Sequence, residues 1–390
     1  MITVDQALDH LFALVSPLPS ETVPLTRAAG RVLARPVAAT RDQPPFAASA
    51  MDGYALRGAE VAPGATFTVI GEAAAGHGFA GVANPGEAVR IFTGAPLPAG
   101  TDHVVIQEDV TREGGRITLT GTPEDKPHVR PAGADFRSGD TLQAPRELTP
   151  SDIALLASMN CANIPVTRQP TVALIATGDE LVMPGEDPGP DQIIASNSFG
   201  LHAMVQAAGA TARLLPIARD TENSLRMAFD LARGADIIVT IGGASVGDHD
   251  LVGKVAQDAG LDRSFYKIAM RPGKPLMAGR MGDAAMIGLP GNPVSALVCG
   301  RIFLIPMIRA LQGLGAAPAP RLAATLATDV GPNGAREHYM RARVDGTGIT
   351  PADRQDSALL TVLSRANALL IRPVNDPARK AGEPADYIPL

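Results

Sequence analysis

Cysteine and lysine are scarce in this sequence of 390 residues. The two cysteines, Cys161 and Cys299, are too few for a disulfide framework and lack metal-ligand spacing, which favours a reducing cytoplasm. Only five of the 34 basic residues are lysines. A lysine in this chain is therefore weak support for a site that needs a compact ammonium group.

The chain also lacks a net positive charge and a long uncharged apolar run. Its net charge of −6 argues against a general nucleic-acid binder. The N-terminus carries Asp5 and Asp9 and no basic region, so it does not read as a signal peptide. The most apolar stretch, 294–311, contains two arginines and predicts a buried helix. We expect a cytoplasmic protein with no membrane or nucleic-acid partner.

The length exceeds what one hydrophobic core usually holds, which predicts several domains. With 40 Gly and 34 Pro, many turns must separate short elements. Short apolar runs divided by Gly and Pro predict a β-rich domain over 40–139. Longer apolar strands alternate with helical segments over 170–315, which predicts a doubly wound parallel sheet. Residues 316–390 return to short strands and predict a C-terminal β domain.

Three polar loops follow predicted strands of this sheet, at 177–180, 242–250 and 289–295. Ligands of open parallel sheets bind outside the carboxyl ends of the strands. The second loop is glycine-rich, and Pro293 in the third is suited to the first position of a helix, so both can present backbone N–H groups to an anion. Neither a Walker A pattern nor a GxGxxG fingerprint is present. The loops predict phosphate binding, but not a standard nucleoside triphosphatase or dehydrogenase.

Charged residues near these loops suggest an oxyanion and a metal. Lys267, Arg271 and Lys274 are close in sequence, and they predict an oxyanion pocket or, alternatively, a solvated basic turn. Glu180, Asp220 and Asp250 are acidic groups beside a predicted phosphate site, and a bridging Mg²⁺ would explain them. The alternative is that each is a turn or helix-cap residue, with Asp220 capping the next helix.

Six ordered segments carry a family resemblance: SAMDGYA, RIFTGAPLP, TGDEL, GGASVGDHD, MRPGKP and GLPGNPVSA. Together they resemble the molybdopterin molybdenumtransferase family (MoeA and the gephyrin E-domain), over essentially the whole chain. The resemblance implies a multidomain α/β plus β fold whose central domain binds the pterin. It also implies a discontinuous linking domain of residues 1–39 and 140–169. Such proteins are homodimers in which the β-rich domain of one subunit lies near the partner's active site.

The resemblance also implies a reaction and a set of site residues. Molybdenum from molybdate enters the dithiolene of adenylyl-molybdopterin, with Mg²⁺-dependent release of AMP. Further partners would be the molybdopterin adenylyltransferase and recipient molybdoenzymes. Asp135 matches an acidic motif position, without an assigned role. The catalytic set, with Lys267 added for its charge, is Asp52, Thr93, Glu180, Asp220, Ser245, Asp250 and Lys267. Within this set, Glu180, Asp220 and Asp250 would hold the metal. The binding set is Gly242, Gly243, Gly247, Pro290, Gly291, Asn292, Pro293, Arg271, Lys274, Ser295, Arg341 and Ser357.

Three other functions remain open at this point. An adenylyltransferase of the same pathway shares a similar sheet, but its chain would be close to the α/β region alone. A non-catalytic molybdopterin carrier or scaffold would be favoured if the loop carboxylates were missing, and they are present. A tungstate-specific insertase is the third, because the two oxyanions are almost equal in size and charge.

Overall fold

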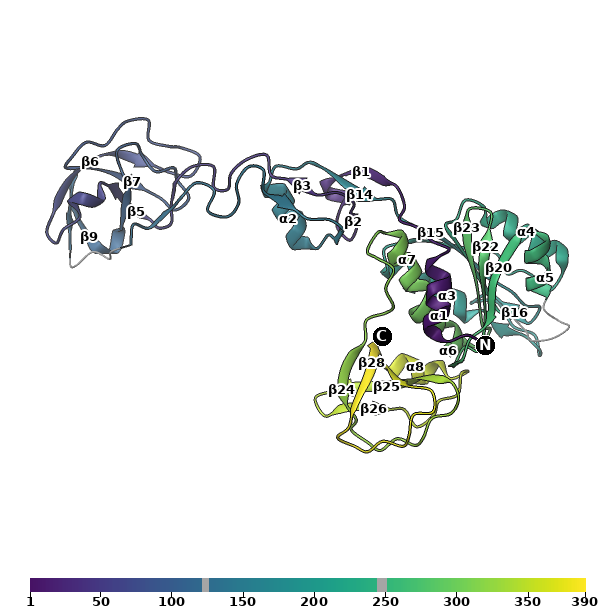
Figure 1. Cartoon of the computed structure of the whole chain (residues 1–390). Helices are drawn as coiled ribbons and strands as arrows, with labels where there is room; N and C mark the ends of the chain where they lie inside the picture. The colour runs from purple at the N-terminus through teal and green to yellow at the C-terminus, as the bar shows by residue number, and fades with distance from the viewer. Residues whose placement is uncertain (121–125, 244–250) are drawn as a thin grey trace.

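The structure is a computed structural model, and it describes residues 1–120, 126–243 and 251–390 (Figure 1). The chain is elongated, with a β-rich unit at one end, a small sheet between, and an α/β unit beside a C-terminal β unit at the other end. This arrangement confirms the expected multidomain α/β plus β fold.

Helix α1 (Val4–Phe12) lies against the α/β unit. Thr3 and Gln6 form its capping box, because each side chain accepts a hydrogen bond from the other residue's backbone N–H. Leu8 and Leu11 are buried in the same apolar core as the strands of the α/β sheet. The N-terminal segment is thereby fixed to an element more than 150 residues away in the sequence.

Two distant segments share the small sheet in the middle of the molecule. The strand order is β1-β14-β2-β13, and every pair is antiparallel. Thr149 caps helix α2, and the helix buries Leu156 in the core beneath the small sheet. The elements are β1 (Ser20–Pro24), η1 (Leu25–Arg27), β2 (Val32–Leu33), β13 (Arg146–Glu147), α2 (Pro150–Ser158) and β14 (Asn163–Thr167).

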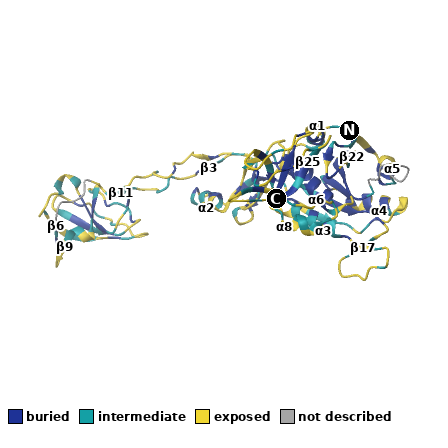
Figure 2. Ribbon diagram, turned by 90° about the horizontal axis from the view of Figure 1, so that it is seen from below, coloured by how far each residue is buried: buried dark blue, intermediate teal, exposed yellow. Residues whose placement is uncertain are grey.

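A six-stranded sheet of order β8-β5-β7-β6-β10-β9 forms most of the β-rich unit. Two short antiparallel pairs, β3 with β12 and β4 with β11, connect it to the small sheet, and Figure 2 shows this connection as largely exposed. The elements are β3 (Val37–Ala38), β4 (Ala48–Ser49), β5 (Gly53–Leu56), η2 (Gly58–Glu60), β6 (Thr66–Ala73), β7 (Glu87–Ile91), β8 (His103–Ile106), η3 (Gln107–Asp109), β9 (Val110–Glu113), β10 (Arg116–Leu119), β11 (Val129–Arg130) and β12 (Thr141–Leu142).

The α/β unit contains a six-stranded sheet of order β18-β15-β19-β23-β22-β20. The first four strands are parallel and match the predicted doubly wound core, whereas β22 and β20 extend it in antiparallel fashion. Helices α1, α3, α6 and α7 supply the core on one face, and α4 and α5 on the other. The elements are β15 (Thr171–Ala176), β16 (Leu181–Val182), β17 (Ile193–Ile194), α3 (Ser196–Ala207), β18 (Thr211–Leu214), α4 (Glu222–Ala232), β19 (Ile237–Ile241), α5 (Leu251–Asp258), β20 (Leu261–Lys267), β21 (Met270–Arg271), β22 (Pro275–Met281) and β23 (Ala284–Leu289).

The predicted long apolar helix is one continuous helical run with an irregular middle. It consists of α6 (Pro293–Cys299), a π-helical segment (Gly300–Leu304) and α7 (Ile305–Leu311). By length and composition the run could cross a membrane, but 83% of its most apolar window is buried inside the structure. It serves as the core helix of the α/β unit.

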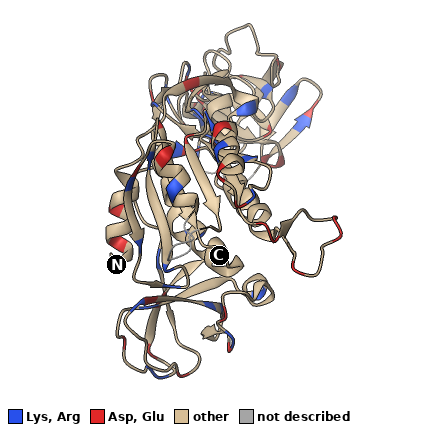
Figure 3. Cartoon of the chain, turned by 90° about the vertical axis from the view of Figure 1, so that its right-hand side faces the viewer, with Lys and Arg blue, Asp and Glu red and all other residues tan. Residues whose placement is uncertain are grey.

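The C-terminal unit joins the α/β unit through a shared sheet. Strand β21 pairs in parallel with β25, in the order β21-β25-β27-β28-β24, and β26 pairs with β25. Tyr339 and Leu369 belong to the same core as α6, so the two units are packed together. Figure 3 shows basic and acidic residues interspersed along these elements. The elements are β24 (Leu322–Thr325), β25 (Glu337–Asp345), β26 (Gly348–Pro351), α8 (Leu360–Arg365), β27 (Ala368–Arg372) and β28 (Pro384–Pro389).

Candidate functional site

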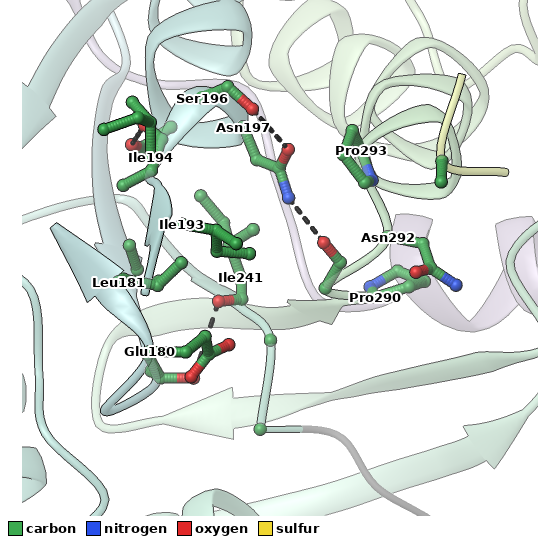
Figure 4. A pocket seen from close by; sticks show the side chains of 18 of the residues that line it. Glu180, Leu181, Ile193, Ile194, Ser196, Asn197, Ile241, Pro290, Asn292 and Pro293 are labelled. Atoms are coloured by element: carbon green, nitrogen blue, oxygen red, sulfur yellow. Dashed lines mark hydrogen bonds between the residues drawn. The ribbon is translucent and has the colours of Figure 1, made fainter. Parts of the chain in front are cut away.

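The loops after β15, β19 and β23 open into one cavity of about 580 Å³ (Figure 4). These strands are adjacent and parallel, so their carboxyl ends meet at one edge of the sheet. The first turn of α3, strands β16 and β17, and Ala358 of the C-terminal unit complete the wall. Seven residues of the predicted site line this cavity: Glu180, Gly242, Gly243, Pro290, Gly291, Asn292 and Pro293.

Two glycines allow the loops to approach each other closely. Gly242 has φ +94, and a Cβ there would lie 2.8 Å from the carbonyl oxygen of Thr177. Gly243 has φ +66, and its Cβ would lie 2.2 Å from Cγ2 of Val252. Only glycine fits both the backbone conformation and the space. The start of the glycine-rich loop is therefore packed directly against the loop after β15.

Two helices begin at the cavity wall. Helix α3 starts after Ala195, and α6 starts after Asn292 with Pro293 in its first turn, as predicted. Neither helix has a side-chain hydrogen bond at its N-cap. The first N–H groups of a helix lack intrahelical partners and carry partial positive charge, so both ends favour an anion.

Acidic residues gather beside the cavity, next to the loop after β15. Asp220 donates its backbone N–H to Oδ1 of Asp179 at 3.1 Å. Asp220 is exposed, but partial desolvation by the neighbouring chain raises the pKa of its carboxyl group, and the charges of Asp179 and Glu180 raise it further. Thr221, not Asp220, caps α4 through its side chain. The capping alternative for Asp220 is therefore wrong, and its carboxylate is held close to like charge.

The predicted cations lie around the turn between β21 and β22. Lys274 is exposed, and the next residue, Pro275, lines the cavity. Arg271 instead lines a second cavity, of about 550 Å³, against the C-terminal unit. Lys267 is half-buried, with Nζ 5.6 Å from the ring centroid of Tyr266. The two cavities thus flank the same turn.

Arg341 is the most buried of the predicted binding residues. Its side chain has no exposed surface, and one Nη donates to the carbonyl of Asp356 at 3.0 Å. Its Nε and other Nη have no partner among the described residues. Burial lowers the pKa of Arg341, and the charge of Arg271 lowers it further. A buried guanidinium with unpaired donors favours a site for an anion.

Two predicted serines belong to or contact the start of α6. Ser295 is buried in the first turn of α6. The carbonyl of Ser357 accepts a hydrogen bond from the backbone N–H of Val294 at 3.0 Å. The loop of the C-terminal unit is thereby attached to the helix start that lines the cavity.

Asp52 and Thr93 contact each other but not this cavity. Asp52 Oδ1 accepts hydrogen bonds from the backbone N–H of Thr93 at 2.8 Å and from its hydroxyl at 2.7 Å. These bonds lower the pKa of Asp52. The pair lies in the β-rich unit, at the far end of the molecule from the α/β sheet (Figure 1). Asp135 lies in the exposed connection, where its N–H donates to the carbonyl of Gln43.

Three predicted residues, Ser245, Gly247 and Asp250, lie outside the described residues. Sequence reasoning missed two polar residues that the structure brings forward. Asn197 lines the first cavity, although it belongs to none of the six motif segments. His338 lines the second cavity, and its Nε2 has no partner among the described residues. No motif signalled His338, because its position depends on pairing between β21 and β25.

Family models match three consecutive regions of the chain. The MoeA N-terminal region (domain I and II) matches residues 2–160, a probable molybdopterin binding domain matches 173–310, and the MoeA C-terminal region (domain IV) matches 323–390.

Named relatives match over most of the chain. A molybdopterin molybdenumtransferase of a Nostoc species is 35% identical over 98% of this chain and 92% of its own. The enzyme of that name from Haemophilus influenzae is 38% identical over 80% of this chain and 78% of its own. A crystal structure of a molybdopterin biosynthesis MoeA protein from Pyrococcus horikoshii covers 100% of this chain and all of its own, with a TM-score of 0.86 and 25% identity.

Proposed function

This chain belongs to the MoeA family, and from that premise we propose how its residues carry out the family reaction. The protein is a molybdopterin molybdenumtransferase. In the proposed reaction, molybdenum from molybdate enters the dithiolene of adenylyl-molybdopterin, the pyrophosphate bond breaks, and AMP leaves. The single observation that carries this proposal is the cavity in which two uncapped helix starts and the glycine loop meet.

The cavity suits a substrate that contains phosphates and a flat ring. The N-termini of α3 and α6 favour the negative charge of the pyrophosphate. Leu181, Ile193 and Ile194 form an apolar part of the wall, and Figure 4 shows them beside Glu180. The apolar part of the wall would contact the flat ring and the helix starts would contact the phosphates, so the ligand would bind in one orientation.

The acidic residues fit a Mg²⁺ ion that is shared with the substrate. Among the described residues, no three His, Cys, Asp or Glu side chains are arranged so that they could hold a metal ion by themselves. Mg²⁺ is usually held by one or two carboxylates plus substrate phosphates, so Glu180 and Asp220 suffice, with Asp250 as a further ligand from the sequence. The raised pKa of Asp220 supports this fit, because a cation would relieve the repulsion from Asp179 and Glu180. When bound, the ion would neutralise charge on the cleaved phosphates.

We assign the oxyanion to the cations between the α/β and C-terminal units. The unpaired donors of Arg341 support this assignment, and Arg271 and Lys274 lie on the neighbouring turn. Ser295 and Ser357 would add hydroxyl groups, and Lys267 would add positive charge. The choice between molybdate and tungstate rests on these contacts, and a tungstate-specific enzyme remains the alternative for the metal inserted.

The proposed enzyme is a homodimer in the cytoplasm. Asp52 and Thr93 are joined to each other at the far end of the elongated subunit, so a partner subunit is needed to bring them to the cavity. Molybdopterin adenylyltransferase and recipient molybdoenzymes would be transient partners. An adenylyltransferase as the function of this chain is disfavoured, because the named relatives match well beyond the α/β region.

The proposal is tested by incubating the purified protein with adenylyl-molybdopterin, Mg²⁺ and either oxyanion, and measuring AMP. We expect AMP release that requires both Mg²⁺ and molybdate. A non-catalytic carrier would bind the substrate and leave it intact, and that result would refute the enzymatic function. Equal rates of AMP release with molybdate and tungstate would show that the enzyme does not distinguish the two oxyanions, and would leave the enzymatic function in place.

A further inference from the structure

We infer that Asn197 is a positioning residue, which holds the loop before α6 so that two helix starts face the same ligand. This inference rests on the proposed function, because it concerns how the same cavity binds adenylyl-molybdopterin. Asn197 belongs to α3, and it therefore lies outside the three loops that follow β15, β19 and β23.

The contact that suggests this role joins two distant elements. The side-chain amide of Asn197 donates to the carbonyl oxygen of Gly291 at 2.6 Å, and Figure 4 shows the bond crossing the cavity wall. The two residues are 94 positions apart in the sequence. Both line the cavity, Asn197 in the first turn of α3 and Gly291 in the loop before α6.

This bond fixes the orientation of one peptide group. The carbonyl of Gly291 and the N–H of Asn292 belong to the same planar trans peptide and point in opposite directions. Holding the carbonyl toward α3 therefore directs the N–H of Asn292 away from it. Asn292 immediately precedes α6 and lines the cavity, so the bond determines where that donor points.

The helices behind the bond are already in close contact. A Cβ on Gly200 of α3 would lie 2.9 Å from Cδ2 of Leu297 in α6. A Cβ on Gly300 would lie 2.7 Å from Cδ2 of Leu201. These two glycines let α3 and α6 pack tightly along their length, and Asn197 extends that fixed geometry to the loop.

Other contacts would keep the loop folded without Asn197. The N–H of Gly242 donates to the carbonyl of Leu289 at 3.0 Å, and the N–H of Val294 donates to Ser357. Loss of the Asn197 amide should therefore free one peptide group rather than unfold the helix. We expect the effect to appear in substrate binding more than in stability.

The test compares Asn197→Ala and Asn197→Ser in the full-length protein. Both remove the amide donor, and serine is well tolerated at a helix start. We expect the KM for adenylyl-molybdopterin to rise at least ~10-fold, equivalent to about 1.4 kcal/mol. The kcat for AMP release should fall less than ~3-fold, and AMP should bind more weakly in calorimetry.

Asn367→Ala is the matched control. Its amide also donates to a backbone carbonyl, that of Val344 at 2.9 Å, but in the C-terminal unit. It should lower the melting temperature without changing the KM. The positioning role would be overturned if the KM stayed unchanged in both Asn197 variants. It would also be overturned if these variants, like the control, lowered the melting temperature and left the KM unchanged. If the parent protein released no AMP, the proposed function would fail first, and AMP binding would still test Asn197.

Discussion

Individual charged residues without partners mark the site more clearly than the fold does. Arg341 is fully buried, and two of its nitrogens have no partner among the described residues. Asp220 is exposed, and the charges of Asp179 and Glu180 act on its carboxylate. Burying an unpaired charge or gathering like charges costs stability, so such groups persist in proteins mainly where a ligand completes them.

Lys274→Ala should raise the molybdate concentration that the reaction requires. Removing one charge-assisted contact costs roughly 2 kcal/mol, which is about 30-fold in the molybdate concentration needed for half-maximal AMP release. Lys254→Ala is the control, because Lys254 pairs with Glu222 on the surface. The claim for Lys274 would fail if the two variants had the same molybdate dependence.

His338 should make stability fall in weakly acidic solution. Burial and the nearby charges of Arg271, Arg341, Arg336 and Arg372 lower its pKa to about 4, below the usual value of 6.5. Between these values the unfolded chain binds a proton that the folded one does not. This contribution, roughly 3 kcal/mol, is present above pH 6.5 and lost as the pH falls to 4.

Urea unfolding between pH 4 and pH 7 measures this effect. His338→Gln removes the titrating group and should flatten the pH dependence of the free energy of unfolding over that range. An identical pH profile in the parent and the variant would show that His338 is not the group responsible.

At the scale of elements, local signals predicted what depends on local sequence. Thr3 and Thr149 each cap a helix start through a side-chain contact within one turn, and a contact of this kind can be read from the local sequence. The sequence predicts a parallel sheet, whereas β22 pairs with β20 and β23 in antiparallel fashion, because no crossover helix separates these strands. The sequence also predicts one regular helix over 294–311, whereas the structure has a π-helical segment in its middle, where Gly300 packs closely against Leu201 of α3.

The candidate site divides in the same way. The motif segments located Glu180 and the LPGNP loop, which the structure brings to one cavity. The contacts of Asn197 and His338 with other elements depend on helix packing and strand pairing across long sequence distances. Such non-local contacts leave no periodic pattern in the sequence.

The turn between β21 and β22 depends on a glycine. Gly273 has φ +103, and a Cβ there would lie 2.4 Å from Sγ of Cys299. Gly273→Ala should cost roughly 3 kcal/mol from backbone strain and overpacking together. Gly282→Ala, with φ +59 and open space, is strained in its backbone alone and should cost only about 1 kcal/mol. Equal losses in denaturant unfolding would contradict the packing part of the argument.

At the scale of the whole molecule, Asp52 precedes β5 in the β-rich unit, at the opposite end of the chain from the cavity (Figure 1). The proposed homodimer would bring it to the partner's cavity. Asp52→Ala and Asp220→Ala subunits should each be inactive alone. Mixed under exchange conditions, half of the dimers are mixed and each has one intact site, so about a quarter of the parent activity should return. If mixing restores no AMP release although mass analysis shows mixed dimers, the shared site is wrong.

The central claim is that the chain transfers molybdenum and cleaves the adenylyl group in one coupled reaction. The most direct measurement is a single-turnover experiment that counts molybdenum bound to the released pterin and AMP formed from the same sample. The account predicts equal amounts of both, and neither without molybdate. AMP formed without molybdenum insertion, or substrate bound and left intact, would contradict it.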